Sequence, residues 1–131
     1  MKLANIKPTP AKFPIKHPVT LEPLTNDEGV EVFWNVVGHD SSEYQDSQQG
    51  FLKHLEKLGD KAADLKQKDY RAQAIKQVAS LVLGWDKEFD DFHGGAFSKK
   101  KVEALLSSSD HGWIMSQLDS FVARRVNFFV E

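Results

Sequence analysis

The chain has 131 residues, the size of one domain, and a domain of that length can bury roughly two thirds of the surface that its unfolded chain exposes. It contains no cysteine, which excludes disulfides and thiolate metal sites. Its 17 basic and 19 acidic residues give a formal net charge of −2 and no basic footprint for nucleic acid. No apolar run approaches the roughly 20 residues of a membrane span, so we expect a soluble, intracellular protein.

The first 18 residues are rich in proline: Pro8, Pro10, Pro14 and Pro18. Each proline fixes its own φ and pushes the preceding residue toward extended geometry. We therefore expect an extended arm over residues 1–18, followed by a single helical domain over residues 19–131. Phe13 and Ile15 could dock on another surface, although a partly ordered terminus is the simpler interpretation.

A β-hairpin is predicted next. Val19, Leu21 and Leu24 suggest a short strand, residues 25–29 form a turn cluster, and residues 30–37 alternate with a period of two. Two strands alone are marginally stable in water. One face must therefore either lie on the helices or pair with a second copy, and the self-association residues would then be Val30, Val32, Trp34 and Val36.

Two helices are predicted after the hairpin. Asp40 and Glu43 resemble a capping box for a helix that ends near Leu58, and Gly59 is a C-cap candidate. A long second helix is expected over residues 61–84. Its apolar stripe is wide enough to be covered from more than one side, so it should be the central element of the fold: Ile75, Val78, Ala79, Val82 and Trp85.

The last third of the chain predicts an acidic aromatic loop over residues 85–97, a short helix capped by Ser98, and a final helix. Val102, Leu105 and Leu106 should point inward from the short helix. The final helix carries its apolar face on Trp113, Ile114, Leu118, Phe121 and Val122. The predicted class is mainly α with a small N-terminal β-hairpin (α+β), with about four helices around a long central helix.

The residues that could carry chemistry form no complete motif. Asp86, Glu88 and Asp90 are spaced like the first calcium ligands, but Asp91 and Phe97 occupy the positions where that loop needs glycine and glutamate. The five histidines lack zinc-protease spacing. His39 and Asp40 stand beside Ser41, but triads are recognised in space and not by chain order. We expect no enzyme activity, no metal and no cofactor.

Two kinds of surface remain as recognition candidates. The basic clusters, Lys99–Lys101 and Arg124–Arg125, could contact phosphate, which gives the alternative of a small nucleic-acid-binding regulator. The aromatic segments could bind a protein partner, or they could close the core of this protein. The partner-binding candidates are Trp85, Phe89, Phe92, Phe97, Phe128, Phe129 and Val130.

From about Pro18 to its end, the chain resembles a tail assembly chaperone of long-tailed bacteriophages. The likeness rests on the hairpin, on residues 39–44 (His-Asp-Ser-Ser-Glu-Tyr) and on residues 81–85 (Leu-Val-Leu-Gly-Trp). It continues through Ser98 with residues 102–106, and through Trp113-Ile114 with Gln117-Leu118. The proline arm departs from the pattern.

This resemblance implies a non-catalytic protein of the host bacterial cytoplasm that is absent from the mature virion. Its partners would be the tape-measure protein, whose long apolar helices it would coat, and the tail tube protein. It would form a homo-oligomer and would bind neither nucleic acid nor membrane. A reversible coat of this kind requires apolar grooves and not a pocket of perturbed titrating groups.

Overall fold

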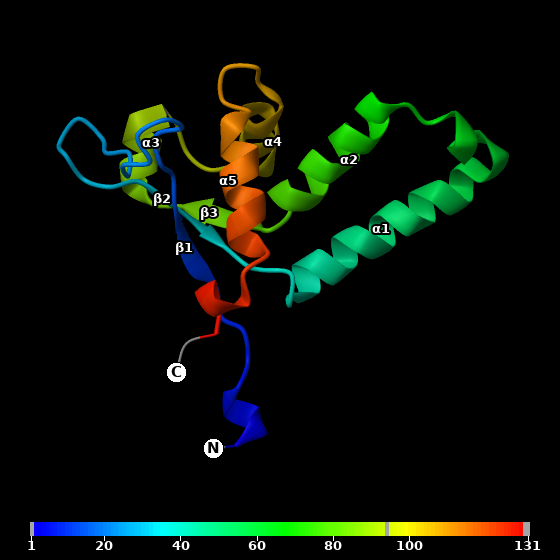
Figure 1. Ribbon diagram of the computed structural model, residues 1–131, viewed down its shortest axis with the longest axis horizontal. Coiled ribbons are helices and arrows are strands. Elements are labelled where there is room, and N and C mark those ends of the chain that lie inside the picture. The colour runs from blue at the N-terminus through cyan, green and yellow to red at the C-terminus, as the bar shows by residue number, and fades with distance from the viewer. Residues whose placement is uncertain (1, 94, 130–131) are drawn as a thin grey trace.

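The computed structural model describes residues 2–93 and 95–129, with side chains at residues 2–90 and 95–129. It is 52% helical and contains a small three-stranded antiparallel sheet and five α-helices in its described part. The predicted α+β class is therefore confirmed at this level. Figure 1 shows two parts, a body built on the sheet and a pair of helices that projects from one side of it.

The sheet has the strand order β1-β2-β3, formed by β1 (Ala11–Pro14), β2 (Phe33–Val36) and β3 (Val82–Trp85). Phe13 pairs with Trp34, and Trp34 pairs with Trp85, so three aromatic residues lie in one row across the strands. Trp34 is fully buried beneath these neighbours and the ring of Phe89. Aromatic contact of this kind adds to simple area burial and fixes the register of the strands.

The proline-containing segment is part of the fold, which corrects the expectation of a partly ordered arm over residues 1–18. Residues 11–14 are extended, as predicted, but they form the edge strand β1, and both Phe13 and Ile15 are buried. Pro14 is tolerated because an edge strand has one side on which its N–H groups are not needed. The amide of Thr9 donates to the carbonyl of Phe128 and ties this segment to the C-terminal end.

Residues 19–24 do not form the predicted strand, because β2 already has partners on both sides, β1 and β3. Val19 and Leu21 are exposed on a loop that returns to β2 through two isolated bridges, Lys16 to Pro23 and Thr25 to Glu31. The turn at residues 25–29 is confirmed, since Gly29 has a φ of 79° and the Asn26 side chain accepts from two later amides.

The single helix predicted over residues 61–84 is wrong in extent. The segment contains a 3₁₀ turn η2 (Gly59–Asp64), the helix α2 (Gln67–Ala79) and the strand β3. Ile75, Val78 and Ala79 are buried, and α2 contacts α1, α4 and α5. The last turn of the predicted helix is a strand instead, because residues 81–85 pair with β2 through backbone hydrogen bonds and bury Val82 and Trp85.

The loop predicted over the acidic segment 85–97 is wrong in part, because Lys87–His93 forms the short helix α3. The two helices predicted after it are confirmed as α4 (Lys99–Ser107) and α5 (Trp113–Val122). The Ser98 hydroxyl caps α4 by accepting from the Lys101 amide, at 3.2 Å. A last 3₁₀ turn, η3 (Arg125–Asn127), leads to Phe128.

One hydrophobic core fills the body between the sheet and helices α2–α5. Its members come from every strand and from each of these helices: Phe13, Ile15, Val32, Trp34, Val36, Ile75, Val78, Val82, Trp85, Phe89, Val102, Leu106, Ile114, Leu118, Val122 and Phe128. The helix α1 (Ser42–Leu58) contributes no buried residue to it. In Figure 1, α1 and α2 run outward from the body and are joined at their far end by η2.

Candidate functional site

Most of the aromatic residues predicted to bind a partner belong to the core. Trp85 is buried, and Phe89 and Phe128 are each only 2% exposed. Phe97 and Phe129 are half-buried against the same cluster. The structure brings Trp85, Phe89 and Phe97 together, with ring centroids 4.7 and 5.1 Å from that of Trp85. The side chain of Phe92 and residue Val130 lie outside the described parts of the chain.

The face predicted for self-association is covered as well. Val32, Trp34 and Val36 are buried in the core, while Val30 is exposed before β2 begins. Of the two alternatives for this face, the one in which it lies on the helices is the one observed. The correction follows from β3, which supplies the extra strand that a two-stranded hairpin lacks.

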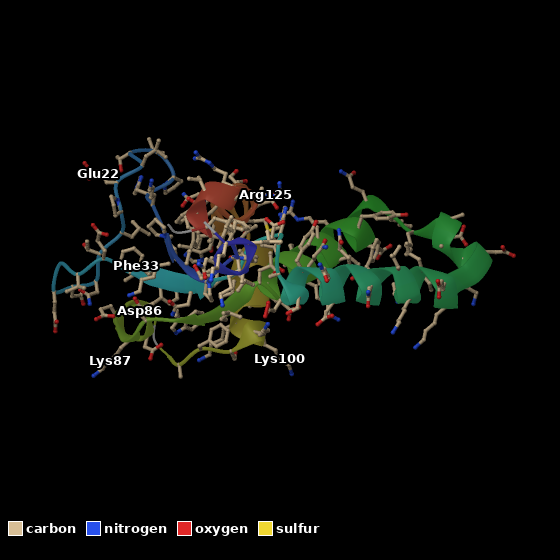
Figure 2. The ribbon with its side chains drawn as sticks, turned by 90° about the horizontal axis from the view of Figure 1, so that it is seen from below. Glu22, Phe33, Asp86, Lys87, Lys100 and Arg125 are labelled. Atoms are coloured by element: carbon tan, nitrogen blue, oxygen red, sulfur yellow. The ribbon has the colours of Figure 1, made fainter. Side chains whose placement is uncertain are left out.

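Three residues of the basic clusters, Lys99, Lys101 and Arg125, are engaged within the chain. Lys99 Nζ donates to the Ser80 carbonyl at 2.9 Å, and Lys101 Nζ donates to the Ala96 carbonyl at 2.7 Å. Arg125 binds both carboxylate oxygens of Asp40, at 2.9 and 3.2 Å, and this hydrogen bond and the charge of Asp40 raise the pKa of Arg125. These cations tie loops to the body, which weakens the case for a phosphate-binding surface. Lys100, labelled in Figure 2, remains exposed.

The acidic residues before and within α3 also have structural partners. Asp86 accepts from Lys12 Nζ and from Asn35 Nδ2, both at 3.3 Å, and Asp90 accepts from the Trp85 indole N–H. Figure 2 shows Asp86 and Lys87 at the end of the body opposite the projecting helices. Among the described residues, no three His, Asp or Glu side chains are placed to hold a metal ion.

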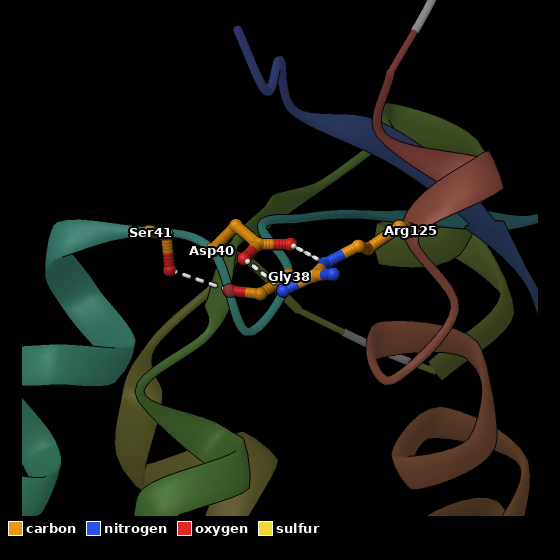
Figure 3. A network of polar contacts seen from close by, with 4 residues as sticks. All are labelled: Gly38, Asp40, Ser41 and Arg125. Atoms are coloured by element: carbon orange, nitrogen blue, oxygen red, sulfur yellow. Dashed lines mark hydrogen bonds and ion pairs between the residues drawn. The ribbon is translucent and has the colours of Figure 1, made fainter.

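The residues His39, Asp40 and Ser41 do not assemble into a relay. The His39 ring stacks on Tyr44 with centroids 4.3 Å apart, Asp40 binds Arg125, and the Ser41 hydroxyl donates to the Gly38 carbonyl at 2.6 Å (Figure 3). The same hydroxyl accepts from the Tyr44 amide, so Ser41 and not Asp40 is the N-cap of α1. The capping box predicted from Asp40 and Glu43 is therefore wrong.

These contacts anchor the base of the projecting helices. The His39 amide donates to the Val122 carbonyl, and Gly38 lies so close to the Phe128 ring that an added Cβ would be 2.7 Å from it. Only glycine leaves room for this approach. The start of α1 is thus fixed to α5 and to the C-terminal turn, while the rest of the helix extends away from the body (Figures 1 and 3).

These two helices, which we call the helical hairpin (α1, η2 and α2), carry part of the apolar surface that the core does not bury. Exposed apolar side chains also occur elsewhere, among them Leu3, Val19 and Val126. The apolar stripe of α1 is formed by Tyr44, Phe51, Leu55 and Leu58, all only half-buried. Leu52 beside it is 58% exposed, and Tyr70 on α2 is 48% exposed. An amphipathic helix normally gains its stability by burying such a stripe. Here seventeen residues of helix bury none.

The side of α2 that α1 faces explains why the apolar stripe of α1 is only half-buried. The apolar side of α2 packs into the body through Ile75, Val78 and Ala79, so its polar side is the one turned toward α1. A groove of about 300 Å³ separates the two helices. It is lined by Ser47, Gly50, Phe51 and His54 from α1 and by Gln73, Lys76, Gln77 and Ser80 from α2. No carboxylate is among these residues.

The sequence contained a signal for this site. In the sequence, Tyr44, Phe51, Leu55 and Leu58 fall on one helical face. The polar side of the next helix is formed by Gln73, Lys76, Gln77 and Ser80. If the apolar face of the first helix meets the polar face of the second, part of the apolar face is left without an apolar partner. The sequence alone does not show that these two faces meet, because it does not show that the apolar face of α2 is turned away from α1.

No described helix is both long and apolar enough to cross a membrane. In comparisons with protein-family models, with curated proteins and with solved structures, nothing matches this chain.

Proposed function

We propose that the protein is a non-catalytic tail assembly chaperone of the long-tailed bacteriophage type, which binds apolar helices of a tape-measure protein and keeps them soluble. The observation that carries this proposal is the helical hairpin, whose longer helix projects from the body with an apolar stripe that is only half-buried and with Leu52 exposed beside it. A helix-binding protein needs such a stripe, since an amphipathic helix is held by anchors placed along an apolar groove.

The location of the stripe supports a reversible role. No fully buried core residue comes from α1, which touches the core only through the half-buried Tyr44, so α1 can bind and release a partner while the body remains folded. Segments with few buried contacts have a low free energy of local opening, and the elements of proteins that move during function usually belong to this class. In this proposal the chaperone also helps to recruit tail tube subunits, and it is displaced as the tail grows. The chaperone acts in the host bacterial cytoplasm as a homo-oligomer and is absent from the mature virion.

Co-expression tests the proposal directly. A fragment of a tape-measure protein that is insoluble alone should remain in the supernatant when this protein is produced with it, and the two should elute together. Because the binding is apolar, the complex should survive about 0.5 M salt, in which phosphate binding would be greatly weakened. A fragment that precipitates equally with and without the protein would contradict the proposed function.

A further inference from the structure

The groove between α1 and α2 has features that specify what could fill it. We propose that it seats an amphipathic partner helix that carries carboxylates beside its apolar anchors. This inference rests on the proposed function, and it assigns the binding site and the charge of the bound segment. Three observations carry it: the unequal walls of the groove, an unexplained glycine, and a lysine without a counter-charge.

The two walls differ in polarity. The α1 wall presents the ring of Phe51 and the bare backbone of Gly50 between Ser47 and His54, whereas the α2 wall is polar throughout, with two amides, a hydroxyl and an ammonium group. Phe51 reaches Tyr70 only by an edge contact, with ring centroids 6.4 Å apart. An apolar side chain entering between the walls would therefore bury Phe51, and polar groups flanking that side chain would meet α2. Only an amphipathic segment satisfies both walls.

Gly50 lines the groove in the middle of α1. Glycine inside a helix costs about 1 kcal/mol relative to alanine. Nothing within this chain requires it, because an added Cβ would meet no atom within 4 Å. A glycine of this kind is explained when another chain approaches the helix backbone closely. At about 300 Å³ the groove is at the small end of ligand pockets, so it would hold anchor side chains of a helix lying across its mouth.

The charge of the lining points to an acidic flank on the partner. Lys76 is exposed on the α2 wall, and it is not among the cations that form ion pairs with described residues. His54 lies on the opposite wall, and no carboxylate lines the groove. Opposite charge on the partner would orient the bound helix, while like charge would be rejected.

Two synthetic helical peptides test this assignment by fluorescence anisotropy. Both carry leucines at i, i+3, i+4 and i+7, and they differ only in glutamate or lysine flanking that face. The glutamate peptide should bind at least about ten-fold more tightly than the lysine peptide. In Lys76→Glu its affinity should fall about five-fold, as expected for one partly exposed charge pair. The matched charge reversal Lys53→Glu, on α1 outside the groove, should change it less than two-fold.

Gly50→Leu separates binding from folding. The substitution fills the groove, and because it removes a glycine from a helix, the melting temperature should stay the same or rise. Affinity for the glutamate peptide should fall more than about ten-fold. The assignment would be overturned by equal binding of both peptides, by the absence of binding to either, or by unchanged binding in Gly50→Leu.

The outcomes distinguish this inference from the function on which it rests. If the parent protein and Gly50→Leu keep a tape-measure fragment soluble equally well, the chaperone function stands and the groove is not its site. If the parent binds the glutamate peptide through the groove but does not rescue the fragment, the groove is a helix-binding site and the proposed function is wrong.

Discussion

At the scale of single residues, the contact between Phe128 and Gly38 closes the core at the base of the helical hairpin. Phe128 is 2% exposed and packs edge-on against Phe121, with ring centroids 5.6 Å apart. Phe128→Ala should lower the free energy of unfolding by about 3–5 kcal/mol, as for other buried phenylalanines. Chemical denaturation would measure this loss. A variant as stable as the parent would mean that Phe128 is a surface residue.

Gly38→Ala tests the same contact from its other side. The new methyl group would meet the Phe128 ring at 2.7 Å, and overpacking of this kind costs about 1–3 kcal/mol. In a Phe128→Ala background the ring is gone, so Gly38→Ala should cost less than it does in the parent. A double-mutant cycle measures the coupling. Equal costs in both backgrounds would show that the ring does not restrict Gly38.

Two aspartate substitutions contrast the buried and open faces of the hairpin. Val78 on α2 is buried, so Val78→Asp would place an unpaired charge in the core and should cost several kcal/mol. Leu52 on α1 is 58% exposed, so Leu52→Asp should change stability by less than about 1 kcal/mol. Thermal melts of the two variants compare these outcomes directly. Similar losses in both would contradict the open position of α1.

At the scale of elements, α1 and the body should differ in local stability. The α1 helix buries no residue, whereas β2 and α5 are packed on the core from end to end. Backbone amides of α1 should therefore exchange with solvent by local opening, well before those of β2 and α5, which require global unfolding. Native-state hydrogen exchange would show two groups of rates. Uniform protection across all three elements would contradict this account of the hairpin.

The elements that the sequence predicts well are those whose signals are local. Ser98 and Gly59 mark helix ends, and the inward residues of α4 and α5 follow from helical spacing alone. The short apolar run 81–85 fits a helix and a strand equally, and only its pairing with β2 decides for the strand. For β1 the prolines gave the extended geometry, but its burial depends on β2, about twenty residues away in the chain.

In the candidate site, too, the local pattern could be predicted from the sequence and the tertiary contacts could not. The apolar stripe of α1 is visible in the sequence as periodic spacing, but whether it is buried depends on which face of α2 it meets. For the aromatic residues of segments 85–97 and 128–129, the partner-binding prediction failed because most of them belong to the core. Their excess suggested an interface, whereas the row formed by Phe13, Trp34 and Trp85 draws Phe89 into the core.

At the scale of the whole molecule, the protein combines a packed body with a projecting helical hairpin, of which α2 contributes to the core while α1 buries no residue (Figure 1). The central claim is that binding and folding are separable on α1. Phe51→Asp with Leu55→Asp changes two half-buried residues of its apolar stripe and leaves the body untouched. The double variant should remain folded, with the melting temperature of the body lowered by no more than a few degrees.

The decisive measurement is the solubility of a co-expressed tape-measure fragment with this double variant, beside the parent protein. We expect the fragment to remain soluble with the parent and to precipitate with the folded double variant. If the folded double variant keeps the fragment soluble as well as the parent does, the open stripe of α1 is not the binding surface, and the account of the helical hairpin is contradicted.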